Sequence, residues 1–262
     1  MLRTGTIPVT LRRVHLIPIF KAGKYPHLAS SRRPISLLST EVKLAESVIY
    51  HRIPLGEEDK LAVEQFAKRR ERGAEMHLVR LMDFTQRALC RGRLCYLVSY
   101  DVAGAFDNVS HTHLMRGLVE FGVDGENRRV IRNWLRLRTF QVRLRLPTGL
   151  WYSSIPPISK GLPQGRVLPP LLWLIFFNAV PRKVELARQV ADGVEINYRD
   201  LLYADDATSH IAADRREVAV EAARKNARVL RETLMEMGLR LNHAKTNALM
   251  IDPAYLLGET FQ

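Results

Sequence analysis

Two short apolar runs in this chain each lead into aspartate, and this feature constrains the fold most strongly. The β-prone run at residues 94–100 delivers Asp101 at its end. A second run, at 201–204, leads directly into Asp205 and Asp206 and predicts a hairpin turn. A carboxylate that ends a buried strand is costly unless it is hydrogen-bonded, paired or bound to a cation. Two such strand ends brought together would need divalent cations, which is the arrangement that two-metal phosphoryl transfer requires.

The same carboxylates also have simpler interpretations. Asp-Asp pairs are common in hairpin turns, so Asp205 and Asp206 alone are weak support for catalysis. Asp107, six residues after Asp101, is expected to cap the helix that follows it. The surrounding motifs must therefore decide between a structural turn and a catalytic centre.

Positive charge is concentrated in two blocks of the sequence. The formal net charge is +13. Residues 1–40 contain seven Lys or Arg and no acidic residue, and residues 127–184 contain eleven and again none. Such blocks can simply be solvated surface, but two long acid-free blocks favour a groove that follows the phosphates of a nucleic acid.

Membrane insertion is not expected, because no apolar stretch reaches the roughly 18–20 residues of a membrane helix. The two cysteines, Cys90 and Cys95, are too few for a structural zinc site. They are expected to be reduced thiols in an intracellular protein.

Helical and strand patterns alternate in an irregular order, which is typical of the α+β class. Strands are expected near 7–24 (with a turn), 94–100, 140–146, 201–206, 207–212 and 245–251. Helices are expected near 40–53, 74–91, 111–121, 126–137, 168–186 and 215–237. Thr40 is the expected cap of the first helix, and Asp214 with Glu217 resembles a capping arrangement for the last.

A series of motifs now gives these features a common context. In chain order they are Arg33-Pro-Ile-Ser-Leu-Leu38, Asp101-Val-Ala-Gly-Ala-Phe-Asp107, Gly161-Leu-Pro-Gln-Gly165, Tyr203-Ala-Asp-Asp206 and Gly238-Leu-Arg-Leu-Asn-His-Ala-Lys-Thr246. In order and spacing they resemble the fingers and palm motifs of reverse transcriptases. The resemblance is closest to non-LTR (LINE-type) retrotransposon enzymes, with group II intron enzymes as relatives, and covers roughly residues 14–251.

The resemblance implies a right-hand polymerase fold with fingers and palm, in which helices back an antiparallel palm sheet. Residues 1–92 would be a fingers-like region and 93–262 the palm, with a fingers segment at about 111–165 inserted. Together they would be one reverse transcriptase domain fragment. The thumb is expected to be largely absent, since only eleven residues follow Ile251.

The resemblance also implies roles for the acidic residues. Asp101, the backbone carbonyl of Val102, Asp205 and Asp206 match the ligands of two Mg²⁺ ions, with Mn²⁺ as the alternative. Carboxylate oxygens, waters and substrate phosphates suit such a small, hard cation. Lys245 matches the lysine that lies near the leaving pyrophosphate and acts as a general acid.

Other motif residues match positions that bind substrate. Arg33 resembles the fingers arginine that grips the nucleotide triphosphate, for which its planar fork of donors is suited. Lys21 is also expected to bind the triphosphate, although Lys24 is close enough in sequence to have this role instead. Gln164 and Gly165 resemble the loop that flanks the template base and the incoming nucleotide.

Two aromatic residues complete the substrate-binding set, Tyr203 and Phe106. Phe106 lies five residues after Asp101, where reverse transcriptases carry an aromatic that blocks a ribose 2′-hydroxyl. Viral RNA-dependent RNA polymerases usually have an acid there, so Phe106, together with Ala204 in the hairpin motif, argues against an RNA polymerase. The alternative is a core phenylalanine at a strand–helix junction.

The implied function is RNA-directed DNA synthesis as part of a retrotransposon. The expected partners are an RNA template, a DNA primer, dNTPs and other domains of a retroelement polyprotein, acting in the nucleus. The alternative is an inactive, truncated, basic nucleic-acid-binding remnant. Arg166 and Pro169, which depart from the family pattern, and the short C-terminal end favour the alternative, whereas the intact acidic residues favour the enzyme.

Overall fold

The computed structural model describes residues 5–23, 25, 27–53, 60–67, 69, 72–136, 138–164, 167–189 and 196–256. The chain forms two compact units, each made of two separate segments. The first unit contains residues 1–57 and 106–176, and the second contains residues 58–105 and 177–262. Strands and helices are mixed within both units, which confirms the α+β class.

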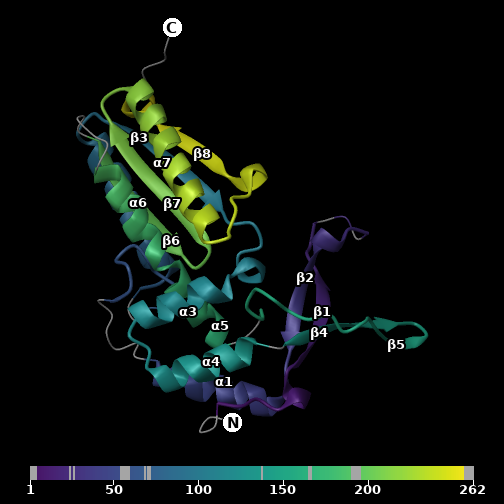
Figure 1. Ribbon diagram of the computed structural model, residues 1–262. Coiled ribbons are helices and arrows are strands. Elements are labelled where there is room, and N and C mark those ends of the chain that lie inside the picture. Colours follow the sequence, from purple (N-terminus) through teal and green to yellow (C-terminus); the bar gives the residue numbers. More distant parts are fainter. Residues whose placement is uncertain are drawn as a thin grey trace. The chain divides into compact units, whose positions relative to one another are not determined.

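The first unit combines a four-stranded sheet with a helical layer (Figure 1). Its strands lie in the order β2-β1-β4-β5, with β1 antiparallel to β2 and parallel to β4. They are β1 (Arg13–Phe20), β2 (Arg32–Leu37), β4 (Thr139–Leu146) and β5 (Gly149–Tyr152). The helices are α1 (Thr40–Arg52), α3 (His111–Glu120), α4 (Gly125–Leu135) and α5 (Leu168–Phe177).

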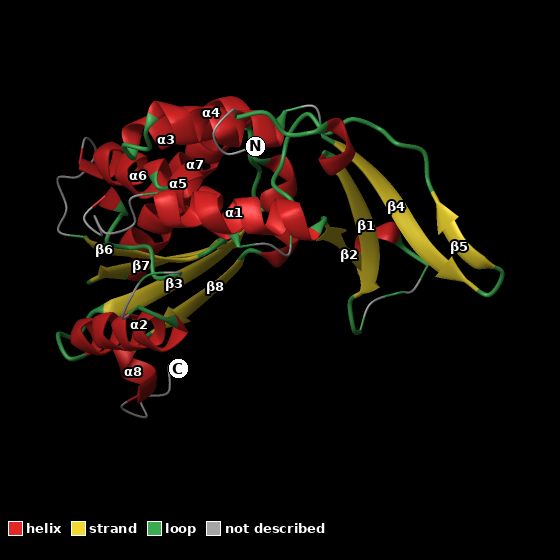
Figure 2. Cartoon of the chain, turned by 90° about the horizontal axis from the view of Figure 1, so that it is seen from below, coloured by secondary structure: helices red, strands yellow, loops and turns green. Residues whose placement is uncertain are grey.

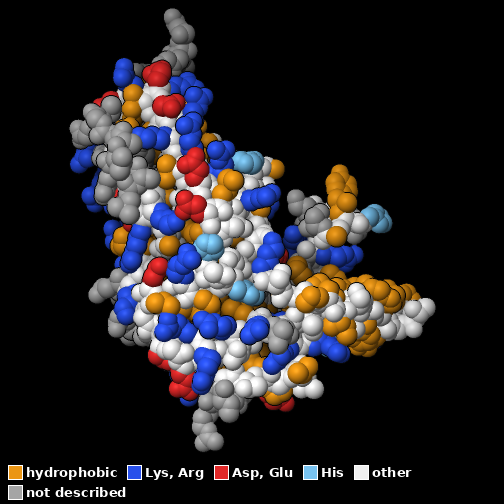
Figure 3. Space-filling model, viewed as in Figure 1, with side chains coloured by type: hydrophobic (Ala, Val, Ile, Leu, Met, Phe, Trp, Pro, Cys, Tyr) orange, Lys and Arg blue, Asp and Glu red, His pale blue; other side chains and the backbone are white. Residues whose placement is uncertain are grey.

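The buried centre of this unit lies among its helices. Side chains from α3, α4 and α5 that are at most 2% exposed include Leu114, Leu118, Ile131, Leu135, Leu172 and Trp173. By contrast, apolar side chains remain exposed along the β4–β5 hairpin, where they form a continuous hydrophobic surface (Figure 3). The hairpin is thus held by its pairing within the sheet rather than by burial.

The second unit is built on an antiparallel sheet in the order β6-β7-β3-β8. Its strands are β3 (Leu94–Asp101), β6 (Asn197–Tyr203), β7 (Asp206–Ala213) and β8 (Asn247–Ile251). Helix α2 (Ala74–Leu89) covers one face, and α6 (Ala179–Gln189) and α7 (Arg216–Glu236) cover the other (Figure 2). A short helix, α8 (Pro253–Leu256), follows β8.

Helix α7 shows why the sequence forms this layer. Its small and apolar residues recur every three or four positions, and those that face the sheet are buried, among them Ala219, Ala223, Leu230 and Leu234. The helix ends just before Gly238, which has a φ of +79° that glycine adopts without strain.

Three of the expected helix caps are wrong. Ser39, not Thr40, caps α1 by accepting from the amide of Val42 at 3.5 Å. Asp214 does not cap α7, because its carboxylate is paired with Arg93 at 2.8 Å. Asp107 lies in a short 3-10 turn (Phe106–Asn108), and Ser110 caps α3 instead. In the last two cases the carboxylate binds a residue that is distant in sequence, Arg93 for Asp214 and Gln164 for Asp107, instead of the amides at the start of the helix.

Two expectations about regular elements also need correction. The helix expected at 168–186 is interrupted at Asn178, whose side chain accepts from the amide of Ala62 and donates to the carbonyl of Lys60. The segment 149–152, which was not among the expected strands, forms β5. Within the described residues, no helix has the length and apolar character to cross a membrane.

The unit boundary lies elsewhere than the division at residue 92. Residues 58–92 belong with the second unit, since α2 packs on β3, β6 and β7. The assignment of the names fingers and palm to parts of the chain stays a prediction.

Candidate active site

The two aspartate-bearing strand ends are brought together in the second unit. Strands β3 and β7 pair antiparallel, and their register places Asp101 directly opposite Asp206. On the other side of β7, Tyr203 of β6 is also opposite Asp206. Because β3 ends at Asp101 and β7 begins at Asp206, both carboxylates lie at the same end of the sheet, as the sequence predicted.

The turn between β6 and β7 is tight and has an unusual backbone. It consists of Ala204 and Asp205, and Ala204 has a φ of +58°, in the left-handed region that favours glycine. A segment preceding α2 supports this turn from the edge of β6. The amide of Phe66 donates to the carbonyl of Leu202 at 2.9 Å, and the side chain of Gln65 accepts from the amide of Ala204 at 3.3 Å.

The aromatic ring of Tyr203 is held by the same region of the unit. The ring of His77, in the first turns of α2, lies edge-on to Tyr203 at 6.3 Å and to Phe66 at 5.7 Å. Sequence reasoning missed Gln65 and His77, because neither the segment before α2 nor the first turns of α2 carry a motif that assigns them to the hairpin.

The ionised form of Asp206 is disfavoured by its surroundings. Burial raises the pKa of Asp206, and the neighbouring carboxylates of Asp205 and Asp101 raise it further, against the opposing effects of Lys245 and His77. A raised pKa means that the ionised form is disfavoured at this position. A bound cation would remove this penalty.

A loop after α7 supplies the groups that contact Asp101. The side-chain amide of Asn242 donates to Oδ2 of Asp101 at 2.9 Å, and Nζ of Lys245 lies 3.2 Å from Oδ1. The backbone is tied to β3 as well, since the amide of Asn242 donates to the carbonyl of Asp101 at 2.8 Å. Lys245 thus reaches the carboxylate of Asp101, and its role near a leaving pyrophosphate stays a prediction. Asn242 of the same motif is an additional contact that was not among the expected site residues.

The donor set suits a hard divalent cation. Within the described residues, no three His, Cys, Asp or Glu side chains lie close enough to enclose a metal ion by themselves. Mg²⁺, however, usually binds through one or two carboxylates and takes its remaining oxygens from water and substrate phosphates. The like-charge cluster around Asp206 and the ammonium that Asp101 already attracts fit such a site.

The motif residues of the first unit form a separate cluster around the turn at Phe106–Asn108. The side-chain amide of Gln164 donates to Oδ1 of Asp107 at 2.8 Å, and the backbone carbonyl of Gln164 accepts from the amide of Ser36 in β2 at 3.2 Å. Gly161 packs so closely on this turn that a Cβ there would lie 2.7 Å from the carbonyl oxygen of Asp107. The glycine-containing loop, the turn and β2 are therefore joined into one framework.

Phe106 is half-buried and stacks on Trp173 of α5, with ring centroids 5.4 Å apart and planes at 28°. Its carbonyl accepts from the amide of Leu162 at 2.7 Å. Both the gate and the core interpretation of Phe106 are compatible with this position, since one face of the ring packs while the residue keeps some exposure.

The basic candidates of the first unit belong to the β1–β2 hairpin. Arg33 is exposed on β2 opposite Ile19, and the amide of Lys21 closes the hairpin by donating to the carbonyl of Ser31 at 2.8 Å. Lys24, Gly165 and Arg166 lie outside the described residues. Pro169 lies in the first turn of α5, where a helix tolerates proline because its amide would have no partner there.

Comparison with known proteins places this geometry in context. The family model described as "Reverse transcriptase (RNA-dependent DNA polymerase)" matches residues 19–261. The RNA-directed DNA polymerase from mobile element jockey of Drosophila melanogaster is 30% identical over 211 residues, covering 79% of this chain and 22% of that protein. The probable RNA-directed DNA polymerase from transposon BS of the same organism is 32% identical, covering 69% of this chain and 20% of that protein. The chain thus spans about a fifth of the length of these curated relatives, whose identity as mobile elements confirms the resemblance to retrotransposon enzymes.

The fold is shared with solved structures at low sequence identity. The structure of apo telomerase from Candida tropicalis, truncated from its C-terminal domain, superposes with a TM-score of 0.62 at 14% identity, covering 94% of this chain and 51% of that one. This likeness confirms the expected polymerase fold.

Proposed function

The chain belongs to the reverse transcriptase family, and on that premise we propose that it is the catalytic region of an RNA-directed DNA polymerase. It would extend a primer 3′-hydroxyl with dNTPs on an RNA template. The observation that supports this best is the register of β3 and β7, which sets Asp101 opposite Asp206 with Asp205 in the adjoining turn. Other domains of a retroelement polyprotein would act with it, and synthesis would take place in the nucleus.

Reverse transcriptases as a family use divalent metal ions, and we propose Mg²⁺ here, with Mn²⁺ as an alternative. Asp101, the carbonyl of Val102, Asp205 and Asp206 would hold two such ions. When bound, the ions would activate the primer hydroxyl and stabilise the charge that develops on the phosphates. The chain's own contribution is to hold its carboxylates at one sheet end, at the cost of the raised pKa of Asp206.

Lys245 would donate a proton to the leaving pyrophosphate. Its Nζ lies 3.2 Å from the carboxylate of Asp101, so its ammonium is already held at the acidic cluster. The hydrogen bonds of Asn242 to Asp101 fix the loop that carries it. A charged lysine there would supply both positive potential and a transferable proton.

Residues of the first unit would recognise the nucleotide and its sugar. Arg33 and Lys21 would bind the triphosphate, and Gln164 with Gly165 would flank the base pair that forms. Phe106 would exclude a ribose 2′-hydroxyl, and its stacking on Trp173 supports this role because a ring that packs on a buried neighbour is held in one place.

Primer extension tests the proposal directly. The substrate is poly(rA) primed with oligo(dT), with Mg²⁺ or Mn²⁺, and wild type is compared with Asp205→Ala. Extension by the wild type alone is the expected result. Equal incorporation by the two proteins would overturn the proposal for this chain.

A further inference from the structure

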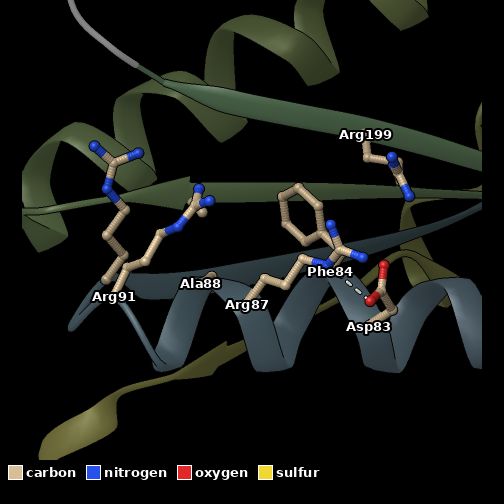
Figure 4. A pocket seen from close by; sticks show the side chains of 8 residues that line it. Asp83, Phe84, Arg87, Ala88, Arg91 and Arg199 are labelled. Carbon is tan, nitrogen blue, oxygen red and sulfur yellow. Dashed lines mark hydrogen bonds and ion pairs between the residues drawn. The ribbon is translucent and has the colours of Figure 1, made fainter.

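A second concentration of positive charge lies in the same unit as the carboxylates. A pocket of about 240 Å³ opens between α2, β6 and the start of β3. Four arginines line it, Arg87, Arg91, Arg93 and Arg199, over apolar side chains that include Phe84. Figure 4 shows Arg91 and Arg199 at opposite ends of this row, with Phe84 and Arg87 between them.

Nearby acids neutralise only half of this charge. Arg87 is paired with Asp83 at 2.8 Å, and Arg93 is paired with Asp214 at 2.8 Å. In the described part of the chain, neither Arg91 nor Arg199 has a carboxylate within ion-pair distance. Two unneutralised guanidinium groups at opposite ends of one pocket (Figure 4) favour a polyanion that is long enough to reach both.

The pocket lies on the same sheet face as the carboxylates but at the other end. Ala212, which lines the pocket, is opposite Cys95 in β3, and Asp101 lies six residues beyond Cys95. Six residues are an even number, so Cys95 and Asp101 point to the same face. At about 3.3 Å per residue the two positions are roughly 20 Å apart.

Helix α2 connects the two ends of this face. Its first turns contact the hairpin motif through His77 and Tyr203, and Ala88 in its last turn packs with Cys95 and Ala212. Exposed Arg80 lies two helical turns before Arg87 and hence on the same side of the helix. Basic side chains therefore follow α2 from the carboxylate end towards the pocket.

We propose that this pocket binds the phosphodiester backbone of a nucleic-acid strand about six nucleotides from the strand end held at the carboxylates. The number follows from a rise of about 3.4 Å per nucleotide along the axis of a duplex, over a separation of roughly 20 Å. The inference rests on the proposed function, because that function places a strand end at Asp101 and Asp206. Arginine suits the role, since its planar fork binds phosphate oxygens in pairs. An acidic peptide would match the charge but would have no reason to share this face with the carboxylates.

The test compares two double variants that lose the same charge. Arg91→Ala/Arg199→Ala removes the unneutralised arginines of the pocket, and Arg228→Ala/Arg231→Ala removes two exposed arginines of α7 on the opposite face. Binding of fluorescent 12-nucleotide RNA, 12-nucleotide DNA and their hybrid is measured without dNTPs at several salt concentrations. The full chain is used throughout.

The pocket variant should bind at least one of these ligands about tenfold more weakly at low salt. The slope of log K against log salt should fall by roughly 1.4 to 1.8 for two lost phosphate contacts. The α7 variant should bind like wild type. The ligand that shows the loss identifies the strand, RNA or DNA, and unchanged binding of all three would overturn the proposal. Binding of a 12-residue polyglutamate peptide is measured as well. If the pocket variant loses binding of this peptide but not of the nucleic acids, the proposal is overturned in favour of an acidic protein partner.

Primer extension then tests the position along the strand. For hairpin substrates with a stem of twelve base pairs, the pocket variant should raise KM about tenfold and leave kcat unchanged. Stems of four base pairs end before the pocket and should be used equally by wild type and variant; an equal rise in KM for both would contradict the proposed spacing. The binding measurement does not require catalysis. It therefore tests the pocket even if equal primer extension by wild type and Asp205→Ala shows that the chain lacks polymerase activity.

Discussion

The backbone amide of Ala204 donates a hydrogen bond to Oε1 of Gln65, an atom that also accepts from the amide of Ala67 at 3.0 Å. Gln65 is 3% exposed, so both bonds are shielded from water. Ala204 is the one non-glycine residue with positive φ in the described part of the chain, a conformation that costs about 1–2 kcal/mol. One buried side chain thus holds the strained turn from which Asp205 projects.

Gln65→Leu should therefore lower kcat more than it changes KM. The substitution removes the acceptor of two amides and lets the turn relax, which displaces Asp205 from the position that catalysis requires. We expect kcat of primer extension to fall about ten- to a hundredfold, with KM for dNTP unchanged. Ala204→Gly in the same chain should restore part of kcat, because glycine adopts the positive φ without strain. A parallel change in kcat and KM, or no rescue, would indicate a purely structural role.

Asp205→Asn should abolish activity while keeping the fold. Removing this charge relieves the repulsion that raises the pKa of Asp206, so the free energy of unfolding should stay the same or increase. Extension should fall by about a thousandfold or more, since one of the proposed ligands of the metal ions is lost. Thermal unfolding with and without Mg²⁺ provides the control. Mg²⁺ should raise Tm for the wild type but much less for the variant, and an equal rise would argue against Asp205 as a ligand.

Phe106→Val should admit ribonucleotides. The smaller side chain would leave room for a 2′-hydroxyl, so the ratio of rNTP to dNTP incorporation should rise about tenfold or more. Trp173→Phe serves as the matched control, because it changes the packing partner of Phe106 and leaves the ring itself in place. If sugar selectivity is unchanged in Phe106→Val, the residue is a core phenylalanine and not a gate.

The parts of this site that local pattern determines could be predicted. The runs that end at Asp101 and before Asp205 are apolar, short and bounded by turn residues, so they form strands wherever they are placed. Antiparallel pairing of β6 and β7 then follows from the two-residue turn between them. The role of Lys245 stays a prediction from the motif that contains it.

The parts that depend on distant partners could not be predicted. Gln65 and Asn178 act through hydrogen bonds to residues more than a hundred positions away, and no periodicity marks them. Asp107 resembled a helix cap until Gln164, 57 residues later, supplied a donor for its carboxylate. The arginine pocket likewise joins α2 to Arg199 across more than a hundred residues. In each case the partner is distant in sequence, so the residues around the side chain carry no sign of the contact.

Gly161→Ala should disrupt the framework of the first unit. Gly161 has a φ of +88°, and a Cβ there would lie 2.7 Å from the backbone oxygen of Asp107. Relieving this overlap would require a shift of the backbone at Gly161 or at Asp107. The left-handed φ alone costs about 1–2 kcal/mol, and the steric overlap adds to it. Urea unfolding should show a loss of at least about 2 kcal/mol. Gly149→Ala is the matched control, because Gly149 also has positive φ but a Cβ there would meet nothing within 4 Å. An equal loss of unfolding free energy in both variants would show that the close contact at Gly161 does not contribute.

His210 should make the second unit sensitive to moderate acid. The residue is fully buried in β7 beside the ring of Phe84, and within the described residues neither of its ring nitrogens has a hydrogen-bond partner. Burial lowers its pKa to about 4, with smaller lowering by His77 and Arg199 and an opposing effect of Asp200. In the unfolded chain the pKa returns to 6.5, so between these values the unfolded state takes up a proton that the folded state does not. Stability contributed by neutral His210 is therefore complete above about pH 7 and is lost as the pH falls towards 4.

The expected loss from this residue between pH 7 and pH 5 is about 2 kcal/mol of unfolding free energy. Urea unfolding of wild type and His210→Leu at the two pH values measures it, because other groups titrate in both proteins and cancel in the difference. His210→Leu should lose about 2 kcal/mol less than wild type over this interval, while His27→Leu, a change at an exposed position, should follow the wild type. Identical pH dependence of His210→Leu and wild type would mean that the ring is protonated in the folded protein, which would require a hydrogen-bond acceptor or a path for water at the centre of this sheet face.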